Sequence, residues 1–189
     1  MYKKYFKRLF DIIFSLSLIA FLSPIIILIF FLVSFAIGFP IFKQKRPGLN
    51  NKIFTLYKFK TLYVSKVLDE TKRENKLGNF LRKYGLDELP QIFNILKNDM
   101  SFVGPRPLLK EYLKKYSKFE LQRHLVKPGI TGLAQVKPEL TGKKSWKKSI
   151  KLDIHYVRNY NLILDLKIIL LTLKIIILNR KQYNDYSKR

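Results

Sequence analysis

Two adjacent carboxylates, Asp87 and Glu88, are the first candidates for chemistry in this sequence. Proline is tolerated in a helix only within the first turn, so Pro90 places Asp87 at or next to the N-cap of a helix. The free N–H groups and the dipole at that end keep an acidic side chain ionised. Asp caps helices very often, and a capping role is therefore the main alternative to a catalytic one.

Three basic residues support a catalytic interpretation. Lys58 follows the apolar N-terminal segment, Arg82 lies about one and a half helical turns before Asp87, and Arg106 stands on a loop stiffened by two prolines. Carboxylates and cations gathered beside a membrane suit phosphoryl transfer, because positive side chains and a divalent ion neutralise a diphosphate while a nucleophile attacks. Each basic residue taken singly is better explained as a charge facing solvent or lipid.

Two short helices are expected to position Asp87. Apolar residues recur at helical spacing from Leu77 to Tyr84, and Gly85 can end that helix in a left-handed cap. The same spacing returns from Leu89 to Leu96. The two acidic residues should therefore lie where these helices meet.

The remaining elements follow from composition and turn signals. The aromatic and β-branched residues of 53–62 predict a strand, whereas the prolines of 98–107 exclude a regular helix there. We expect a basic helix over 108–126 and a turn-rich loop over 127–132. The apolar run at 162–178 predicts a helix in the membrane interface, with a core helix as the alternative.

The N-terminal segment from Ile12 to Phe42 contains no charged residue and is long enough to cross a bilayer. Ser23 and Pro24 stand near its middle, where proline should break or sharply bend a helix, although the Ser23 hydroxyl can bond to the preceding turn. Each half is about as long as half a crossing. A re-entrant hairpin is therefore expected, in which the chain enters and leaves the membrane by the same face.

The charges that flank this segment agree with a hairpin. Basic residues precede it (Lys3, Lys4, Lys7 and Arg8) and follow it (Lys43, Lys45 and Arg46), which marks both ends as cytoplasmic. A spanning helix and a cleaved signal peptide, with Ser34–Ala36 as a loose cleavage site, are the alternatives. The apolar stretch is longer than that of an ordinary signal peptide.

Composition limits the partners of the chain. Its 189 residues include 37 Lys and Arg against 13 acidic residues, a net charge of +24 that must meet phosphate on nucleic acid, lipid or a polyanionic substrate. The absence of cysteine excludes disulfides and a Cys-based zinc site. His124 and His155 are too few and too far apart for a His cluster.

Five segments, in the same order along the chain, resemble the bacterial sugar transferases, the monotopic phosphoglycosyl transferases. They are FKQKRPG at 42–48, YKFKT at 57–61, LDELPQ at 86–91, DMSFVGPRP at 99–107 and PGITGLAQV at 128–136. The short chain is most similar to the minimal catalytic members, of the type that starts protein N-glycosylation in Campylobacter-like bacteria.

This resemblance implies transfer of a sugar phosphate from a UDP-sugar to polyprenol phosphate. Asp87 would be the nucleophile that forms an aspartyl-phosphosugar intermediate, with Glu88 assisting as base, ligand or orienting group. Mg²⁺ would bind at Asp87 and the diphosphate. Lys58, Arg82 and Arg106 match family positions near the phosphates, and the family has a re-entrant anchor that breaks where Ser23 and Pro24 stand.

One segment departs from the family pattern. Many relatives continue after residue 136 with an Asn-Gly-Arg-like stretch, whereas this chain has KPELTG at 137–142, so a basic side chain is missing or moved to Lys143 or Lys144. The identity of the sugar is therefore left open.

Two rival functions remain. One is a basic membrane scaffold or nucleic-acid binder, supported only by the charge excess and the aromatic residues, and the other is a prenyl diphosphate hydrolase, which differs in the acceptor.

The sequence thus predicts an α-dominated, irregular α/β fold. It comprises a re-entrant helix-break-helix anchor (1–43), a catalytic domain with interfacial amphipathic helices (44–178) and a polar tail (179–189). We expect a monotopic protein on the cytoplasmic face of the inner membrane. The expected partners are a UDP-sugar, polyprenol phosphate and anionic lipid headgroups, with Mg²⁺ as cofactor and no nucleic acid.

Overall fold

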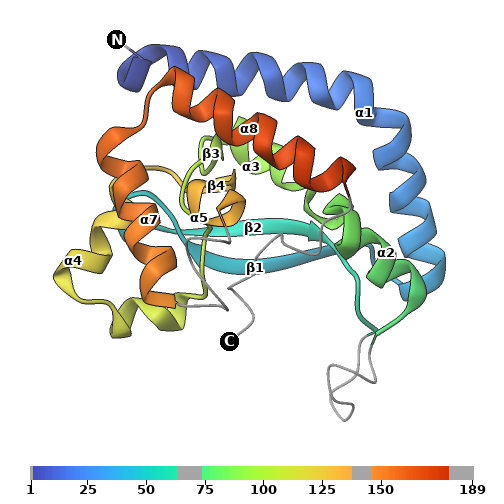
Figure 1. Cartoon of the computed structure of the whole chain (residues 1–189). Coiled ribbons are helices and arrows are strands. Elements are labelled where there is room, and N and C mark those ends of the chain that lie inside the picture. Colours follow the sequence, from blue (N-terminus) through green and yellow to red (C-terminus); the bar gives the residue numbers. More distant parts are fainter. Residues whose placement is uncertain (1, 64–73, 138–145, 179–189) are drawn as a thin grey trace.

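A computed structural model describes residues 2–63, 74–137 and 146–178 (Figure 1). The helices are α1 (Lys7–Ile37), α2 (Lys76–Tyr84), α3 (Gln91–Leu96), α4 (Lys118–Leu121), α5 (Leu133–Val136), α7 (Trp146–Asn159) and α8 (Leu162–Ile177). The strands are β1 (Ile41–Pro47), β2 (Ile53–Phe59), β3 (Ser101–Val103) and β4 (Gly129–Thr131). Short helical turns are η1 (Tyr2–Phe6), η2 (Leu49–Asn51), η4 (Leu86–Glu88), η5 (Lys110–Lys115) and η6 (Gln122–Leu125).

The described part of the chain is helix-rich with two small sheets, which confirms the α-dominated fold class. The predicted polar tail lies outside the described residues.

The hairpin β1–β2 runs through the middle of the molecule (Figure 1). Its strands are antiparallel, with Ile41 opposite Phe59 at the open end. Phe54 and Leu56 of β2 are buried in the main core. Lys58 shares their face of the strand, because successive side chains of a strand point to opposite faces. The predicted strand is therefore confirmed over Ile53–Phe59, and it directs Lys58 toward the interior.

The turn between α2 and α3 differs from the prediction in one respect. Gly85 ends α2 in the left-handed conformation as expected, with φ 69° and ψ 13°. However, residues 86–88 form a 3₁₀ turn of their own, and α3 begins only at Gln91 with Pro90 as its N-cap. The prediction that Asp87 lies at or next to the N-cap of the second helix is therefore wrong. A capping role does not account for Asp87.

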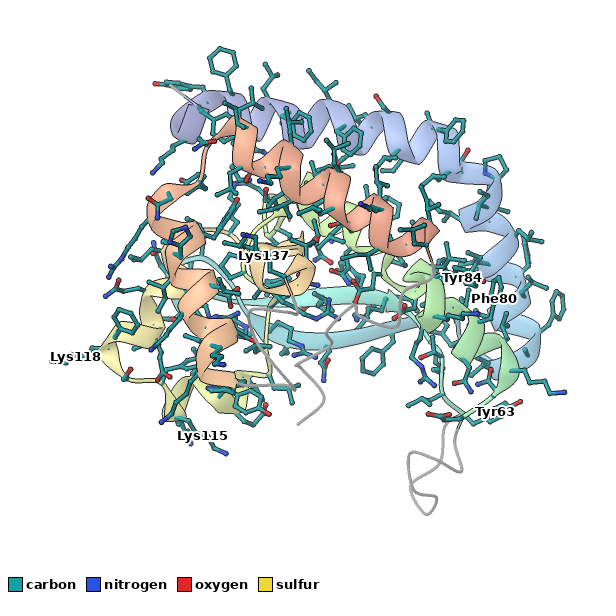
Figure 2. The ribbon with its side chains drawn as sticks, in the orientation of Figure 1. Tyr63, Phe80, Tyr84, Lys115, Lys118 and Lys137 are labelled. Carbon is teal, nitrogen blue, oxygen red and sulfur yellow. The ribbon has the colours of Figure 1, made fainter. Side chains whose placement is uncertain are left out.

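An aromatic pair marks the exposed side of α2. Phe80 and Tyr84 lie one turn apart with their ring centroids 5.0 Å from each other (Figure 2). The predicted helix is confirmed over Lys76–Tyr84, but of its predicted apolar residues Leu81 is buried whereas Phe80 is 52% exposed.

The loop that carries Arg106 packs directly against the loop before β4. The Gly104 N–H donates to the Thr131 carbonyl at 2.9 Å, and the Gly129 N–H donates to the Pro105 carbonyl at 3.1 Å. A Cβ on Gly129 would lie 2.1 Å from the Gly104 nitrogen, so only glycine permits this approach. The parallel strands β3 and β4 extend this contact.

The prediction of one basic helix over 108–126 is wrong. The segment divides into η5, α4 and η6, and its exposed lysines include Lys115 and Lys118 (Figure 2). The cause is Ser117, which caps α4 by accepting a bond from the Glu120 N–H while Glu120 bonds back to the Ser117 N–H. Sequence reasoning also missed α7, whose buried residues Ile150, Asp153 and Ile154 have helical spacing.

Helix α1 is continuous from Lys7 to Ile37 and contains Pro24. Figure 1 shows that it bends sharply about midway, so the helix bends rather than breaks. Because Pro24 has no N–H, the Ala20 carbonyl lacks its usual partner, and the Ser23 hydroxyl donates to that carbonyl at 3.0 Å. The predicted role of the Ser23 hydroxyl is therefore confirmed.

The first limb of α1, before the bend, is joined to the rest of the chain by buried polar contacts. Arg8 donates to the Ile95 carbonyl at 2.6 Å, close to the end of α3. The buried Asp11 carboxylate accepts from the Ser101 hydroxyl at 3.0 Å and from the Phe102 N–H at 3.1 Å. This limb therefore packs on the same body as α3 and β3.

The second limb, after the bend, packs on the hairpin and α2. Ile29, Val33 and Ile37 form a buried cluster with Phe59 and Leu81. Both ends of α1 thus contact one folded unit. The division into an anchor and a catalytic domain at residue 43 stays a prediction.

Two helices present large apolar surfaces. Within the described ranges, α1 is the one helix long and apolar enough to cross a membrane, judged by length and composition. On α8, Asp165 and Ile168 are buried, whereas Ile163, Leu170 and Ile177 are at least 66% exposed. Helix α8 therefore packs on the main core with one face and exposes the other, and its place in the membrane interface stays a prediction.

Candidate functional site

Three of the predicted site residues meet around the Glu88 carboxylate. Lys58 Nζ and Arg106 Nη2 each lie 2.7 Å from Glu88 Oε1. Arg106 Nη1 donates to Glu88 Oε2 at 3.5 Å. Glu88 belongs to the turn η4. The strand β2 supplies Lys58, which is 30 residues from Glu88 in the sequence, and the loop after β3 supplies Arg106, which is 18 residues away. The fold therefore assembles a buried cluster of two cations and a carboxylate.

Asp87 lies beside this cluster but is held differently. Its Oδ2 is 3.8 Å from Lys58 Nζ, too far for a hydrogen bond. Burial, together with the neighbouring Glu88 charge, raises the pKa of Asp87 to about 6, and Lys58 and Arg106 offset only part of this. The ionised carboxylate of Asp87 is thus the less satisfied of the two.

Glu88 has the opposite electrostatic balance. Burial alone would raise its pKa, but Arg106 and Lys58 outweigh burial through charge and hydrogen bonds and hold the pKa below its ordinary value. Glu88 therefore stays ionised at neutral pH. The two adjacent carboxyl groups have pKa values moved in opposite directions, a pattern common at catalytic sites.

Two residues that the sequence analysis did not assign to the site line the cavity beside the cluster. Its volume is about 10 Å³, and it is lined by Arg46, Leu56, Lys58, Glu88, Gln91, Arg106 and Pro107. Arg46 and Gln91 were not predicted as site residues, although both belong to segments quoted for the family resemblance. Arg46 is buried and donates to the Pro107 carbonyl at 3.2 Å.

Arg82 is placed differently from the other predicted site residues. It bonds to the Asn79 side chain, lies 3.3 Å from Glu74 and donates to the Thr61 hydroxyl at 3.4 Å. Its role at the phosphate site stays a prediction. Lys143 and Lys144, the suggested replacements for a missing basic residue, lie outside the described residues.

The arrangement fits a metal that takes few protein oxygens. Among residues 2–63, 74–137 and 146–178, no group of three or more His, Cys, Asp or Glu side chains could hold a metal ion. Magnesium commonly takes one or two carboxylates and completes its shell with water and substrate phosphates. Asp87 suits such a site better than Glu88, because the Glu88 oxygens already accept bonds from Lys58 and Arg106.

Comparison with known proteins identifies the family of this chain. The family model described as bacterial sugar transferase matches residues 2–179. The sugar transferase EpsL of Bacillus subtilis is 46% identical over 89% of this chain and 85% of that protein. A UDP-glucose:undecaprenyl-phosphate glucose-1-phosphate transferase of Klebsiella pneumoniae is 41% identical over 94% of this chain. An undecaprenyl-phosphate glucose phosphotransferase of Komagataeibacter xylinus is 35% identical over the same share.

The alignment covers only 41% and 37% of the Klebsiella and Komagataeibacter proteins, whereas it covers most of the Bacillus protein. The family match nevertheless extends from the first turn η1 to the end of α8. It includes the bent apolar helix, the two adjacent carboxylates and the loop of Arg106. The chain belongs to the bacterial sugar transferase family.

Proposed function

We propose that this enzyme transfers a sugar phosphate from a UDP-sugar to undecaprenyl phosphate and releases UMP. The observation that carries the proposal is the difference between the two adjacent carboxylates. Glu88 is held by two cations, whereas Asp87 is ionised above about pH 6 and is 3.8 Å from the Lys58 ammonium group. The Klebsiella relative is named for transfer of glucose 1-phosphate from UDP-glucose to undecaprenyl phosphate, and the Komagataeibacter relative is named as an undecaprenyl-phosphate glucose phosphotransferase.

The reaction would proceed in two displacements. In the first, an Asp87 carboxylate oxygen attacks the sugar-bearing phosphorus of the UDP-sugar, the bond from that phosphorus to the bridging oxygen breaks, and UMP leaves. In the second, a phosphate oxygen of undecaprenyl phosphate attacks the same phosphorus and the Asp87 carboxylate is released. The products are UMP and undecaprenyl diphosphate sugar, and the enzyme is unchanged.

Lys58 and Arg106 would stabilise the charge that develops on the transferred phosphate. Both are aimed by Glu88, which each contacts at 2.7 Å. A carboxylate with a lowered pKa is a poor base. Of the three roles left open for Glu88, the orienting role therefore has the best support.

A bound Mg²⁺ would be held by Asp87 and the substrate phosphates, where it neutralises diphosphate charge. Its proximity would also favour the ionised form of Asp87. Treatment with EDTA is expected to stop UMP release, and added Mg²⁺ to restore it.

The two ends of α1 support a re-entrant anchor. Arg8 and Asp11 on the first limb bond to α3 and β3, and Ile37 at the end of the second limb packs on β2 and α2. The Asn94 amide of α3 donates to the Thr55 carbonyl of β2 at 2.7 Å, so these elements form one body. A straight spanning helix would separate its ends by a bilayer. Both ends, and the active site, would therefore lie on the cytoplasmic face of the inner membrane.

Cysteine labelling tests this topology. Because the chain lacks cysteine, single Lys3→Cys and Lys52→Cys variants carry one reactive thiol each. In intact spheroplasts, a membrane-impermeant maleimide is expected to label neither, and in inverted vesicles to label both. Phe21→Cys, at a side chain 80% exposed and near the bend, is the control that should react in neither preparation. Labelling of positions 3 and 52 from opposite faces would show a spanning helix.

The function itself is tested by UMP release from purified protein with a panel of UDP-sugars, Mg²⁺ and undecaprenyl phosphate. We expect release with one or a few sugars and a new lipid product that carries the sugar. Phosphate release from a prenyl diphosphate, without a sugar-bearing lipid, would instead favour the hydrolase. No UMP with any sugar would contradict the proposal.

A further inference from the structure

The peptide of Arg106 is held by a second arginine. Arg123 in η6 donates from Nη2 to the Arg106 carbonyl oxygen at 2.7 Å. The carbonyls on either side have other donors, since the Gly129 N–H bonds to Pro105 and Arg46 Nη1 bonds to Pro107. The path of this loop decides where the Arg106 guanidinium points. The contact from Arg123 is therefore made at the residue whose side chain meets Glu88.

Arg123 is itself fixed from behind by an acid on another helix. Its side chain is fully buried, and its Nε and Nη2 lie 3.1 and 2.7 Å from Asp153 Oδ2 on α7. Asp153 is also buried, with 1% of its side chain exposed. One planar guanidinium thus bonds to Asp153 and to the Arg106 carbonyl at the same time, a geometry that its fork of donors permits.

His124 also lies beside Arg123, as does Tyr116, whose hydroxyl accepts from Arg123 Nη1 at 3.4 Å. The Nε2 of His124 is 3.4 Å from Arg123 Nη1, and its Nδ1 is 2.6 Å from Asn51 Oδ1. Since Asn51 Oδ1 can only accept, the network assigns the proton to Nδ1 and leaves Nε2 to accept from Arg123. Burial, and then the Arg123 charge, lower the pKa of His124 to about 3. Arg123 therefore has a neutral imidazole beside it. Of Asp153, His124 and the Arg106 carbonyl, Asp153 is the group whose negative charge balances Arg123.

Stability alone does not explain this pair. A buried ion pair loses most of its Coulombic gain to desolvation, and apolar residues of similar size are often as stable or more stable. An apolar pair could not donate to the Arg106 carbonyl. Neither Arg123 nor Asp153 lines the cavity of the candidate site.

We infer that Arg123 and Asp153 are positioning residues for the candidate active site. Asp153 holds Arg123, Arg123 holds the Arg106 peptide, and Arg106 in turn contacts Glu88. The inference rests on the proposed function for its kinetic consequence, but its structural consequence can be measured without substrate.

The first test replaces both members of the pair. The double variant Arg123→Met with Asp153→Leu keeps the core filled and removes both charges of the pair together, so it is expected to fold. We expect its kcat for UMP release to fall about 10- to 100-fold, because small displacements of a catalytic group have effects of this size, with KM for the UDP-sugar changed much less. Arg158→Lys is the matched control, since Arg158 lies on α7 and bonds to Gln122 at the surface. Parent-like kcat in the apolar pair would overturn the inference.

A double-mutant cycle separates positioning from a general effect on folding. Arg123→Lys, Arg106→Lys and their combination are compared by kcat. If Arg123 acts through Arg106, the combined variant should be about as slow as Arg106→Lys alone. If the fold decreases in kcat of Arg123→Lys and Arg106→Lys multiply in the combined variant, Arg123 acts independently of Arg106 and the inference is wrong.

Hydrogen exchange of the amides in 101–107 gives a readout that needs no substrate. Exchange there is expected to be faster in the apolar pair variant than in the parent, and unchanged in Arg158→Lys. Unchanged exchange in the apolar pair would overturn the inference. If the parent releases no UMP, the proposed function fails while this measurement still decides whether Arg123 holds the loop.

Discussion

Asp87→Asn is expected to abolish UMP release, with a loss of about 10⁴-fold or more, because the amide cannot serve as the attacking carboxylate. The same change should leave the thermal midpoint at pH 8 at least as high as that of the parent. The raised pKa of Asp87 means that the folded protein disfavours its ionised form, and asparagine removes that charge. Inactivity with undiminished stability would place the defect in the chemistry.

A trapping experiment accompanies this variant. Incubation of the parent with UDP-sugar but no undecaprenyl phosphate should give a stoichiometric burst of UMP and a protein mass increased by a phosphosugar. Asp87→Asn should show neither. Glu111→Gln, at an exposed acid in η5, is the control for loss of one negative charge and should retain both. UMP release by Asp87→Asn at the parent rate would refute the covalent mechanism.

Glu88→Gln is expected to lower kcat/KM by about 10²- to 10³-fold and to move its pH dependence. The rate falls because Lys58 and Arg106 lose the carboxylate that aims them. The pH dependence moves because the Glu88 charge helps to raise the pKa of Asp87. Without it, Lys58 and Arg106 act on Asp87 alone, and the Asp87 pKa falls.

The direction of the pH shift follows from the chemistry of the nucleophile. In the proposed mechanism Asp87 attacks as a carboxylate, so the parent kcat/KM should show an acidic limb set by the pKa of Asp87, which is about 6 without a bound metal and lower with Mg²⁺ held there. In Glu88→Gln the acidic limb should lie at lower pH. The profile is measured at one Mg²⁺ concentration with Glu111→Gln as control. A limb that stays in place, or moves to higher pH, would show that Glu88 does not act on Asp87 in this way.

Several features of the fold could be predicted because they depend on neighbours in the sequence. Gly85 ends α2 through its own backbone freedom, and the alternation of β2 follows from local residue types. The bend of α1 follows from Pro24, which removes one N–H wherever the helix lies. Local signals failed where two were in competition, as at Ser117, whose capping box ended the helix expected over 108–126.

The candidate site also has features that depend on sequence neighbours and features that depend on contacts between distant residues. The sequence by itself determined that Asp87 and Glu88 are adjacent, that Arg106 stands on a stiff loop and that an apolar helix precedes both. Only the tertiary structure decided which carboxylate is clamped and which is available, because Lys58 and Arg106 reach Glu88 from 30 and 18 residues away. Electrostatic interactions depend on distance in space and on burial, and neither can be read from adjacency along the chain.

The pairing of Arg123 with Asp153 likewise could not be predicted from the sequence. Their separation of 30 residues gives no signal of a pair, and each taken singly resembles a surface charge. Folding of α7 against η6 removes water from both and directs the guanidinium to the Arg106 carbonyl. The sequence therefore determined the candidate reacting groups, and the packing of distant elements decided their ionisation and their orientation.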